Sequence, residues 1–212
     1  FLRSHDIKAI LVACGTVSTT ALPQLRQESD IPILGVVEPA CRRAAAVTRN
    51  RRVGLIATAA SVRSGAYQRS LRQLDPDIAV TAKACPLFVP LVENGRFRRG
   101  DVVIETVARE YLEPLRREGL DTLILGCTHY PLLTDIIGDI MGPGVTLINT
   151  GEEAAWELKR TLRAMDLLAP EGPAGRATLC ASDQPEHFGS LAAYFLGESL
   201  TRPVQPVDID RY

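Results

Sequence analysis

The sequence predicts an α/β protein built on mostly parallel sheets. Short apolar runs alternate with longer amphipathic stretches along the whole 212-residue chain, which is the order expected of strand–helix units joined by right-handed crossovers. Most of the apolar runs are near-continuous in Val, Ile, Leu and Ala, a pattern typical of strands covered on both faces. With 46% hydrophobic residues, the chain can bury a core, and intrinsic disorder is excluded.

The apolar runs are predicted as strands in the order in which they occur. Each is bounded by polar or turn-forming residues and is short enough for a buried strand. The runs are 7–14, 31–37, 52–58, 78–84, 121–127, 145–149 and 177–182.

The segments between these runs carry apolar residues at helical spacing. In 151–168, for example, Ala155, Leu158 and Leu162 share one face and acidic residues fill the first turn, as favoured by the helix dipole. The segment 85–100 contains Pro and Gly and breaks the alternation, so we predict a functional or interdomain loop there. The predicted helices are 17–29, 39–50, 61–74, 101–118, 132–141, 151–168 and 185–196.

Charge and cysteine content exclude several classes of protein. A formal net charge of −1 argues against electrostatic binding of nucleic acid. No apolar run is long enough for a membrane span and no secretory leader is visible, so we expect a cytoplasmic protein without a membrane partner. The cysteines are widely spaced and form no Cys-x-x-Cys pair, which predicts free thiols, no metal site and no redox disulfide.

Two apolar runs end in a cysteine followed closely by a threonine. They are "LVACGTVS" (11–18) and "LGCTHYP" (125–131), about one small α/β domain apart in the sequence. Ligands in open α/β sheets bind outside the carboxyl ends of strands, where Cys14 and Cys127 are predicted to lie. A helix N-terminus there would lower a cysteine pKa and offer N–H groups to a carboxylate.

Three interpretations of these motifs are open. Two facing thiols could take an α-proton from one side of a ligand and return one from the other, which inverts a stereocentre. A single Cys–His site, with His129 as the proton acceptor, would instead indicate nucleophilic catalysis on an acyl group. Most cysteines in apolar runs are simply packed, and this is the interpretation we keep for Cys41, Cys85 and Cys180.

Five motifs, in order along the chain, resemble those of glutamate racemases, in the cofactor-independent aspartate/glutamate racemase superfamily. "CPLFVPLVE" combined with "GCTHYPLL" is a specific pairing, and the resemblance covers essentially the whole chain. The motifs are "VACGT" (12–16), "GVVEPA" (35–40), "VGLIATAASVRSGAY" (53–67), "CPLFVPLVENG" (85–95) and "LGCTHYPLL" (125–133).

The resemblance implies a site residue by residue. Cys14 and Cys127 would be the catalytic thiols, with His129 beside the second of them. Thr16 and Thr128 would bind the substrate, and Thr58 matches a threonine that holds a substrate carboxylate. Glu93 falls in a region that holds an assisting acid, although a solvated loop glutamate is as good an interpretation; Glu38 either contributes similarly or only caps a helix.

The implied function is racemisation of L-glutamate to D-glutamate for peptidoglycan, without a cofactor or a metal. The partner would be the small-molecule substrate, and family members are often dimers, so a homodimer is compatible with the resemblance. A pyridoxal-phosphate enzyme is disfavoured, because none of Lys8, Lys83 and Lys159 lies in a setting suited to a Schiff base.

The chain departs from the family pattern in two places. Gly15 stands where an asparagine is usual, so its backbone N–H would bind the substrate instead, or a racemase of aspartate or hydantoin type would result. The glycine-rich Asp-Ser motif that opens family members is not in the sequence, which predicts an N-terminal truncation and, as an alternative, a catalytically impaired binding module.

The resemblance also implies two Rossmann-like or flavodoxin-like α/β domains with the active site in the cleft between them. Residues 1–39 and 148–212 would form domain one, whose first strand and helix are missing. Residues 40–147 would form domain two.

Overall fold

The computed structural model describes residues 1–173, 175–197 and 200–212. The chain forms two compact units. The larger comprises Lys8–Leu168, and the smaller combines Phe1–Ile7 with Ala169–Tyr212.

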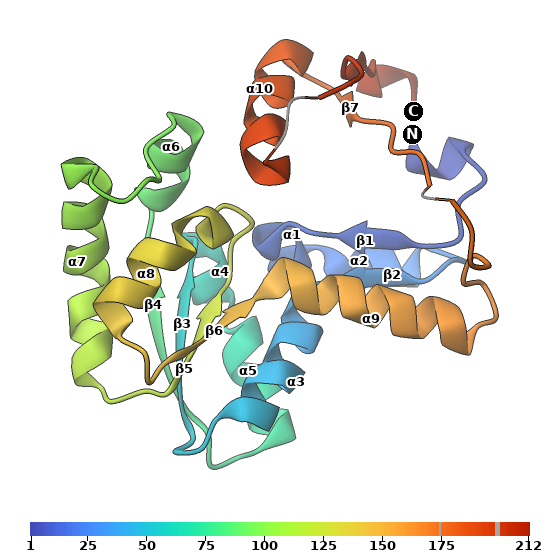
Figure 1. The fold of residues 1–212 in the computed structure, drawn as a ribbon. Coiled ribbons are helices and arrows are strands. Elements are labelled where there is room, and N and C mark those ends of the chain that lie inside the picture. Colours follow the sequence, from blue (N-terminus) through green and yellow to red (C-terminus); the bar gives the residue numbers. More distant parts are fainter. Residues whose placement is uncertain (174, 198–199) are drawn as a thin grey trace. The chain divides into compact units, whose positions relative to one another are not determined.

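A four-stranded parallel sheet forms the centre of the larger unit, in the order β4-β3-β5-β6 (Figure 1). The chain passes from β3 to the edge strand β4 and then returns to β5 on the other side of β3. The ends of β3 and β5 therefore form a topological switch point, where loops leave the sheet in opposite directions. The strands are β3 (Arg52–Ala57), β4 (Ala79–Ala84), β5 (Thr122–Leu125) and β6 (Thr146–Asn149).

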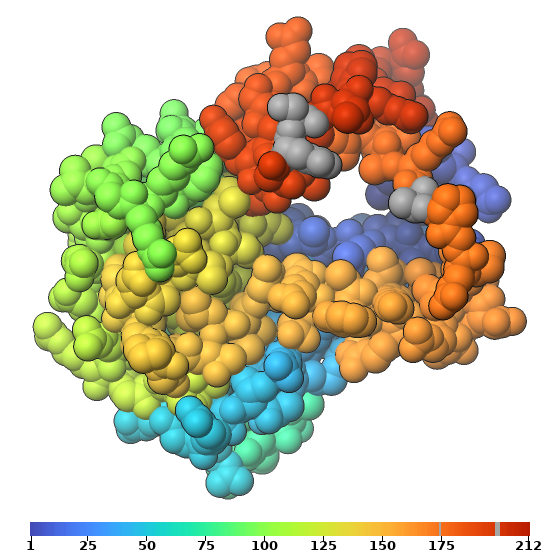
Figure 2. Space-filling view, in the orientation of Figure 1, coloured from blue at the N-terminus to red at the C-terminus, as the bar shows by residue number. Residues whose placement is uncertain are grey.

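Helices cover both faces of this sheet because successive strand residues point to opposite sides. Ile56 and Leu123 pack with helices on one face, whereas Leu55 and Ile124 pack with helices on the other. Figure 2 shows the side chains of α7 and α8 forming one surface over the first face. The first face carries α6 (Phe88–Glu93), α7 (Val102–Arg117), the 3-10 helix η2 (Tyr130–Leu133) and α8 (Thr134–Met141); the second carries α3 (Val37–Val47) and α5 (Ala66–Leu74).

A second, two-stranded parallel sheet lies in the N-terminal part of the same unit. Its strands pair in the register Ile10↔Ile33 to Val12↔Gly35. Its elements are β1 (Ile10–Val12), α1 (Gly15–Thr20), α2 (Leu22–Gln27) and β2 (Ile33–Gly35), and α9 (Thr150–Ala164) packs against β2 and α3.

The smaller unit contains one short parallel strand pair, in which Cys180 lies opposite Gln205. Its elements are η1 (Leu2–Ser4), β7 (Cys180–Ala181), α10 (Pro185–Leu196), β8 (Gln205–Pro206) and η3 (Ile209–Arg211).

The predicted α/β fold with mostly parallel sheets is confirmed, and each predicted strand contains an observed one. Some predicted elements differ in detail. The predicted helix 61–74 is divided into α4 (Ala59–Ser64) and α5 by Gly65, whose φ of 65° ends the first helix. The predicted loop 85–100 contains α6, and the predicted helix 17–29 is divided into α1 and α2.

The predicted domain boundaries at residues 40 and 148 stay a prediction. The two compact units divide the chain at residues 7–8 and 168–169. Among the helices in the described ranges, none combines the length and apolar character needed to cross a bilayer.

Candidate active site

The second cysteine motif lies directly after β5, at the switch point of the sheet. Cys127 is buried, with 7% of its surface exposed. Gly126 precedes it and donates its N–H to the Ile56 carbonyl at 2.8 Å. A Cβ on Gly126 would lie only 3.0 Å from that of Ala57, so glycine is required for Cys127 to follow the strand this closely.

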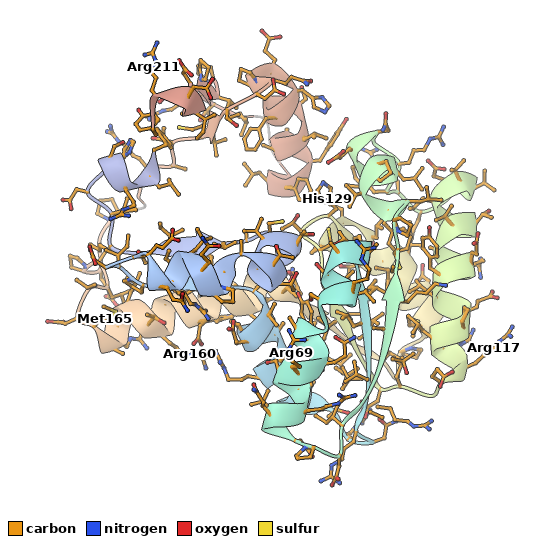
Figure 3. The ribbon with its side chains drawn as sticks, turned by 180° about the vertical axis from the view of Figure 1, so that it is seen from behind. Arg69, Arg117, His129, Arg160, Met165 and Arg211 are labelled. Carbon is orange, nitrogen blue, oxygen red and sulfur yellow. The ribbon has the colours of Figure 1, made fainter. Side chains whose placement is uncertain are left out.

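A histidine lies next to the Cys127 thiol, and a glutamate lies next to that histidine. His129 Nδ1 lies 3.8 Å from Cys127 Sγ and 3.3 Å from Thr128 Oγ1. On the other side of the ring, His129 Nε2 lies 3.0 Å from Glu93 Oε1. Glu93 is the last residue of α6, and Figure 3 labels His129 beside that helix. The side chains of Glu93, His129 and Cys127 thus contact one another in series.

The first cysteine motif lies after β1. Cys14 is the N-cap of α1 and is exposed. Thr16 Oγ1 lies 2.9 Å from Thr58 Oγ1. Thr58 donates its hydroxyl to Ser61 Oγ at 3.1 Å and caps α4 by accepting the Ser61 N–H. This chain of hydroxyls joins α1 to the end of β3.

The two motifs meet backbone to backbone. A Cβ built on Gly15 would overlap the Gly126 carbonyl oxygen and would lie 3.8 Å from Ser61 Oγ. Residue 15 follows the first thiol and residue 126 precedes the second, so this contact brings both cysteines to one place. The hydroxyls of Thr16, Thr58 and Thr128 lie at the same edge of the sheet.

Burial controls the chemistry of the second thiol. It raises the pKa of Cys127, although hydrogen bonds from His129 and Thr128 act in the opposite direction, and negative charge on Cys14 raises it further. The expectation of a pKa lowered by a helix N-terminus is therefore wrong for Cys127. Only the short η2 follows it, and desolvation outweighs the local N–H groups. Cys127 is a thiol at neutral pH and needs a base beside it.

The remaining cysteines have surroundings that suit packing. Cys41 and Cys85 are fully buried, and burial raises the pKa of each to about 12. Cys180 lies in β7 of the smaller unit. Within the described ranges, no group of three His, Cys, Asp or Glu side chains is arranged to hold a metal ion.

The sequence analysis did not identify Ser61, which is fully buried and completes the hydroxyl chain. The spacing Thr58-x-x-Ser61 is the available signal, because a helix N-cap commonly bonds to the third residue after it.

Glu38 lies in the first turn of α3, where it pairs with Arg26 at 2.9 Å.

Comparison with known proteins gives one consistent result. The Asp/Glu/hydantoin racemase family matches residues 1–158. A glutamate racemase of Geobacter metallireducens is 46% identical over 94% of this chain and 73% of its own length.

Solved structures agree with this match. Glutamate racemase isoform RacE1 of Bacillus anthracis superimposes with a TM-score of 0.91 at 35% identity, over 99% of this chain and 77% of the other. A Francisella tularensis glutamate racemase in complex with D-glutamate gives a TM-score of 0.89 at 30% identity, over 100% and 78%.

Proposed function

The chain belongs to the Asp/Glu/hydantoin racemase family, and we propose that it interconverts L-glutamate and D-glutamate with two cysteine thiols as its acid and base. Its similarity to glutamate racemases supports this substrate over aspartate or hydantoin. Its biological role is the supply of D-glutamate for peptidoglycan. The partner is the small-molecule substrate.

One observation carries the mechanism: the contact of Gly15 with Gly126, which brings Cys14 and Cys127 to the same edge of the sheet. A thiolate on one cysteine takes the α-proton, so that a C–H bond breaks and an S–H bond forms. The thiol opposite then gives its proton to the other face of the α-carbon. One proton is taken and one is returned, and no oxidant or reductant is consumed.

Glu93 and His129 prepare the buried thiol. If His129 Nε2 carries the ring proton and donates it to Glu93 at 3.0 Å, the lone pair of Nδ1 faces Cys127 Sγ. The imidazole can then accept the thiol proton, and Glu93 stabilises the resulting imidazolium, as a carboxylate does in a catalytic triad. This offsets the burial that raises the pKa of Cys127.

The substrate carboxylates are assigned to hydroxyl and backbone donors. Thr16, Thr58 and Thr128 lie at the carboxyl edge of the strands, where the hydrogen-bonded pair Thr16–Thr58 spans 2.9 Å. The Gly15 N–H belongs to the first turn of α1 and is a further donor.

The test is deuterium exchange. The protein is incubated with L-glutamate in D₂O, and deuterium at the α-carbon is measured by NMR together with the D-enantiomer. Cys14→Ser and Cys127→Ser should each abolish racemisation. Cys180→Ser is the matched control, because Cys180 lies in the smaller unit and should leave the rate unchanged. Full racemisation by either of the first two variants would refute the two-thiol mechanism.

A binding module without catalysis is the second candidate. It predicts glutamate binding, measured by calorimetry, with no α-proton exchange in the same sample.

The proposed location is the cytoplasm. The proposed assembly is a homodimer, and light scattering of the purified protein would test this assembly.

A further inference from the structure

The contact between Glu93 and His129 joins two short elements outside the sheet. Glu93 is the last residue of α6, which spans only Phe88–Glu93, and His129 is the N-cap of η2. Neither side chain comes from a strand, so the pairing of the strands does not fix the 3.0 Å between Glu93 Oε1 and His129 Nε2. That distance depends on the residues that hold α6 against η2.

Tyr130 is held at both ends between these two elements. It is the first residue of η2 and is fully buried. Its backbone N–H donates to the Cys127 carbonyl at 3.2 Å, and its hydroxyl donates to the Cys85 carbonyl at 3.0 Å. The side chain therefore reaches from the segment that carries His129 to the residue at which the chain leaves β4 towards α6.

The Cys85 carbonyl binds both segments at once. In addition to the Tyr130 hydroxyl, it accepts the N–H of Phe88, the first residue of α6, at 3.3 Å. The Cys85 N–H in turn donates to the carbonyl of Ala57, the last residue of β3, at 3.0 Å. The start of α6 and the tyrosine beside His129 are thus fixed to each other and to the end of the sheet.

Aromatic packing supports the same link. The fully buried ring of Phe88 meets that of Tyr130 edge to face, with 5.2 Å between the centroids and 87° between the planes. It meets Tyr111 of α7 in a similar way, at 5.3 Å and 73°. Pairs with this geometry are favourable beyond the area that they bury, so they hold the first turn of α6 in one orientation on η2 and α7.

The hydroxyl of Tyr130 is a structural donor and not a reacting group. Burial raises its pKa, and negative charge on Cys127 and Cys85 raises it further, so it stays protonated across the physiological range. Its proton is given to the Cys85 carbonyl and is therefore not available to a substrate. Any effect of Tyr130 on catalysis has to pass through the residues that it holds.

We propose that Tyr130 is a positioning residue of the racemase site, which holds Glu93 against His129 and so assists proton transfer at Cys127 but not at Cys14. The inference rests on the proposed function. A histidine base works best when a carboxylate keeps it oriented, and a misplacement of about 1 Å is enough to lower a rate by orders of magnitude. Cys14 lies in a different element, as the N-cap of α1.

Tyr130→Phe keeps the ring and removes only the hydroxyl. The Cys85 carbonyl retains the Phe88 N–H, so the variant should fold. We expect kcat to fall roughly tenfold in both directions with KM changed by less than about twofold, because the substrate-binding groups are untouched. Tyr67→Phe is the control and should keep the wild-type rates. Its ring is fully buried on the opposite face of the sheet, and its hydroxyl has no hydrogen-bond partner in the described part of the chain.

Isotope effects distinguish this role from a general loosening of the fold. Each enantiomer of glutamate carries deuterium at the α-carbon, and its racemisation is followed in H₂O. If proton transfer at Cys127 becomes the slow step, the isotope effect should rise for the enantiomer whose α-proton Cys127 removes. It should fall for the other enantiomer, whose α-proton Cys14 removes. A loss of folded protein would lower both rates and leave both isotope effects unchanged.

A double variant tests whether Tyr130 acts through Glu93. Tyr130→Phe should cost little more when Glu93→Gln is already present, because both changes act on one contact. Losses that multiply, or isotope effects equal to those of the wild type, would overturn the positioning role. If Tyr130→Phe does not fold, Phe88→Leu replaces it, since loss of the ring contact at the start of α6 should give the same isotope effects.

Crystal structures of the wild type and Tyr130→Phe give a measurement that does not depend on activity. In the variant we expect the separation of Glu93 Oε1 and His129 Nε2 to exceed the range of a hydrogen bond. An unchanged separation of 3.0 Å would overturn the proposal. Absence of α-proton exchange in the wild type would instead refute the proposed function, and the two crystal structures would still decide whether Tyr130 holds Glu93 in place.

Discussion

At the scale of single residues, the two proposed catalytic thiols differ in their surroundings. Cys14 is exposed at the start of α1, whereas Cys127 is buried and has a pKa above its ordinary value. A buried thiol needs a neighbouring base to ionise, and His129 is in contact with it. The proposed acid–base pair is therefore asymmetric. The histidine and the glutamate that assist proton transfer in the proposed mechanism lie beside the second thiol, Cys127.

The variant Glu93→Gln tests whether ionisation of Cys127 depends on the His129 base and its glutamate partner. The amide keeps the shape of the side chain but cannot stabilise an imidazolium, so we expect kcat/KM to fall by about tenfold to hundredfold. Steady-state rates in both directions give the measurement. Glu113→Gln, at an exposed position of α7, is the control and should retain the wild-type rate. An unchanged rate in Glu93→Gln would show that Glu93 does not stabilise the His129 imidazolium.

Gly15→Ala should separate the two thiol motifs. A Cβ at this position overlaps the Gly126 carbonyl, and α1 must move away from β5 to accommodate it. We expect kcat to fall about a hundredfold, the usual consequence of an ångström-scale displacement of reacting groups. Gly144→Ala is the control, since a Cβ there meets no atom within 4 Å. Equal rates for the two variants would show that close approach at residue 15 is not needed.

At the scale of elements, the end of the sheet opposite the site depends on one buried aspartate. Asp121 accepts hydrogen bonds from Thr48 Oγ1 at 2.7 Å and from the backbone N–H groups of Arg49 and Asn50 at 2.7 and 2.9 Å. Thr122 also donates to it at 2.9 Å. These bonds tie the turn between α3 and β3 to the start of β5, and so they fix the register of the strands that carry Thr58 and Cys127.

Asp121→Ala should therefore destabilise the fold. The donors would lose their acceptor inside the protein, so we expect the free energy of unfolding to fall by about 2–3 kcal/mol. Urea titration followed by circular dichroism provides the measurement. Asp77→Ala, an exposed site, is the control and should change the stability by less than about 0.5 kcal/mol.

The same aspartate predicts a pH dependence of stability. Burial alone would raise the pKa of Asp121, but the hydrogen bonds outweigh it and the net pKa is lowered. Its contribution is complete above the pKa of an unfolded aspartate and is lost as pH falls through the lower folded value. The stability difference between wild type and Asp121→Ala should thus shrink in acid. A difference that is constant from neutral pH to pH about 2 would contradict this.

At the scale of the whole molecule, the cysteines report on the state of the fold. Cys14 is exposed, whereas Cys41 and Cys85 are buried in clusters on opposite faces of the sheet. The pKa of each buried thiol is raised to about 12. Cys14 is therefore accessible in the native protein, whereas Cys41 and Cys85 become accessible only when the helices detach from the sheet.

Alkylation with iodoacetamide should follow this order. In the native protein we expect modification of Cys14 and protection of Cys41 and Cys85, because a buried neutral thiol is a poor nucleophile. Peptide mass mapping measures the extent at each site. In denaturant all five cysteines should react. Rapid native labelling of Cys41 would mean that α3 and α5 do not stay packed on the sheet.

Much of the fold could be predicted because it depends on local patterns. The continuous apolar runs at 52–58 and 121–127 marked strands buried on both faces, and β3 and β5 lie inside them. The helix break at Gly65 depends on a backbone with φ of 65°, which a helical apolar spacing does not reveal. The helix in 85–100 was missed for a similar reason, because Pro90 lies in its first turn and its short apolar sequence has no clear period.

The site was predicted unevenly. Cys14, Cys127, Thr58 and His129 follow strand ends, and residues at strand ends are recognisable in the sequence. The links between them join distant segments, as with Thr16 to Thr58 and Glu93 to His129. Ser61 and Tyr130 were not assigned a role, because a buried polar group has meaning only when its partners are known.

The sequence by itself determined the strand–helix order, the parallel sheets and the family, because apolar periodicity and contiguous motifs are written along the chain. Only the tertiary structure decided that Gly15 touches Gly126, that Cys127 is buried with a raised pKa, and that the Tyr130 hydroxyl donates to the Cys85 carbonyl. The physical reason is common to all three. Desolvation, steric exclusion and hydrogen-bond satisfaction depend on which distant residues surround an atom, and folding alone brings those residues together.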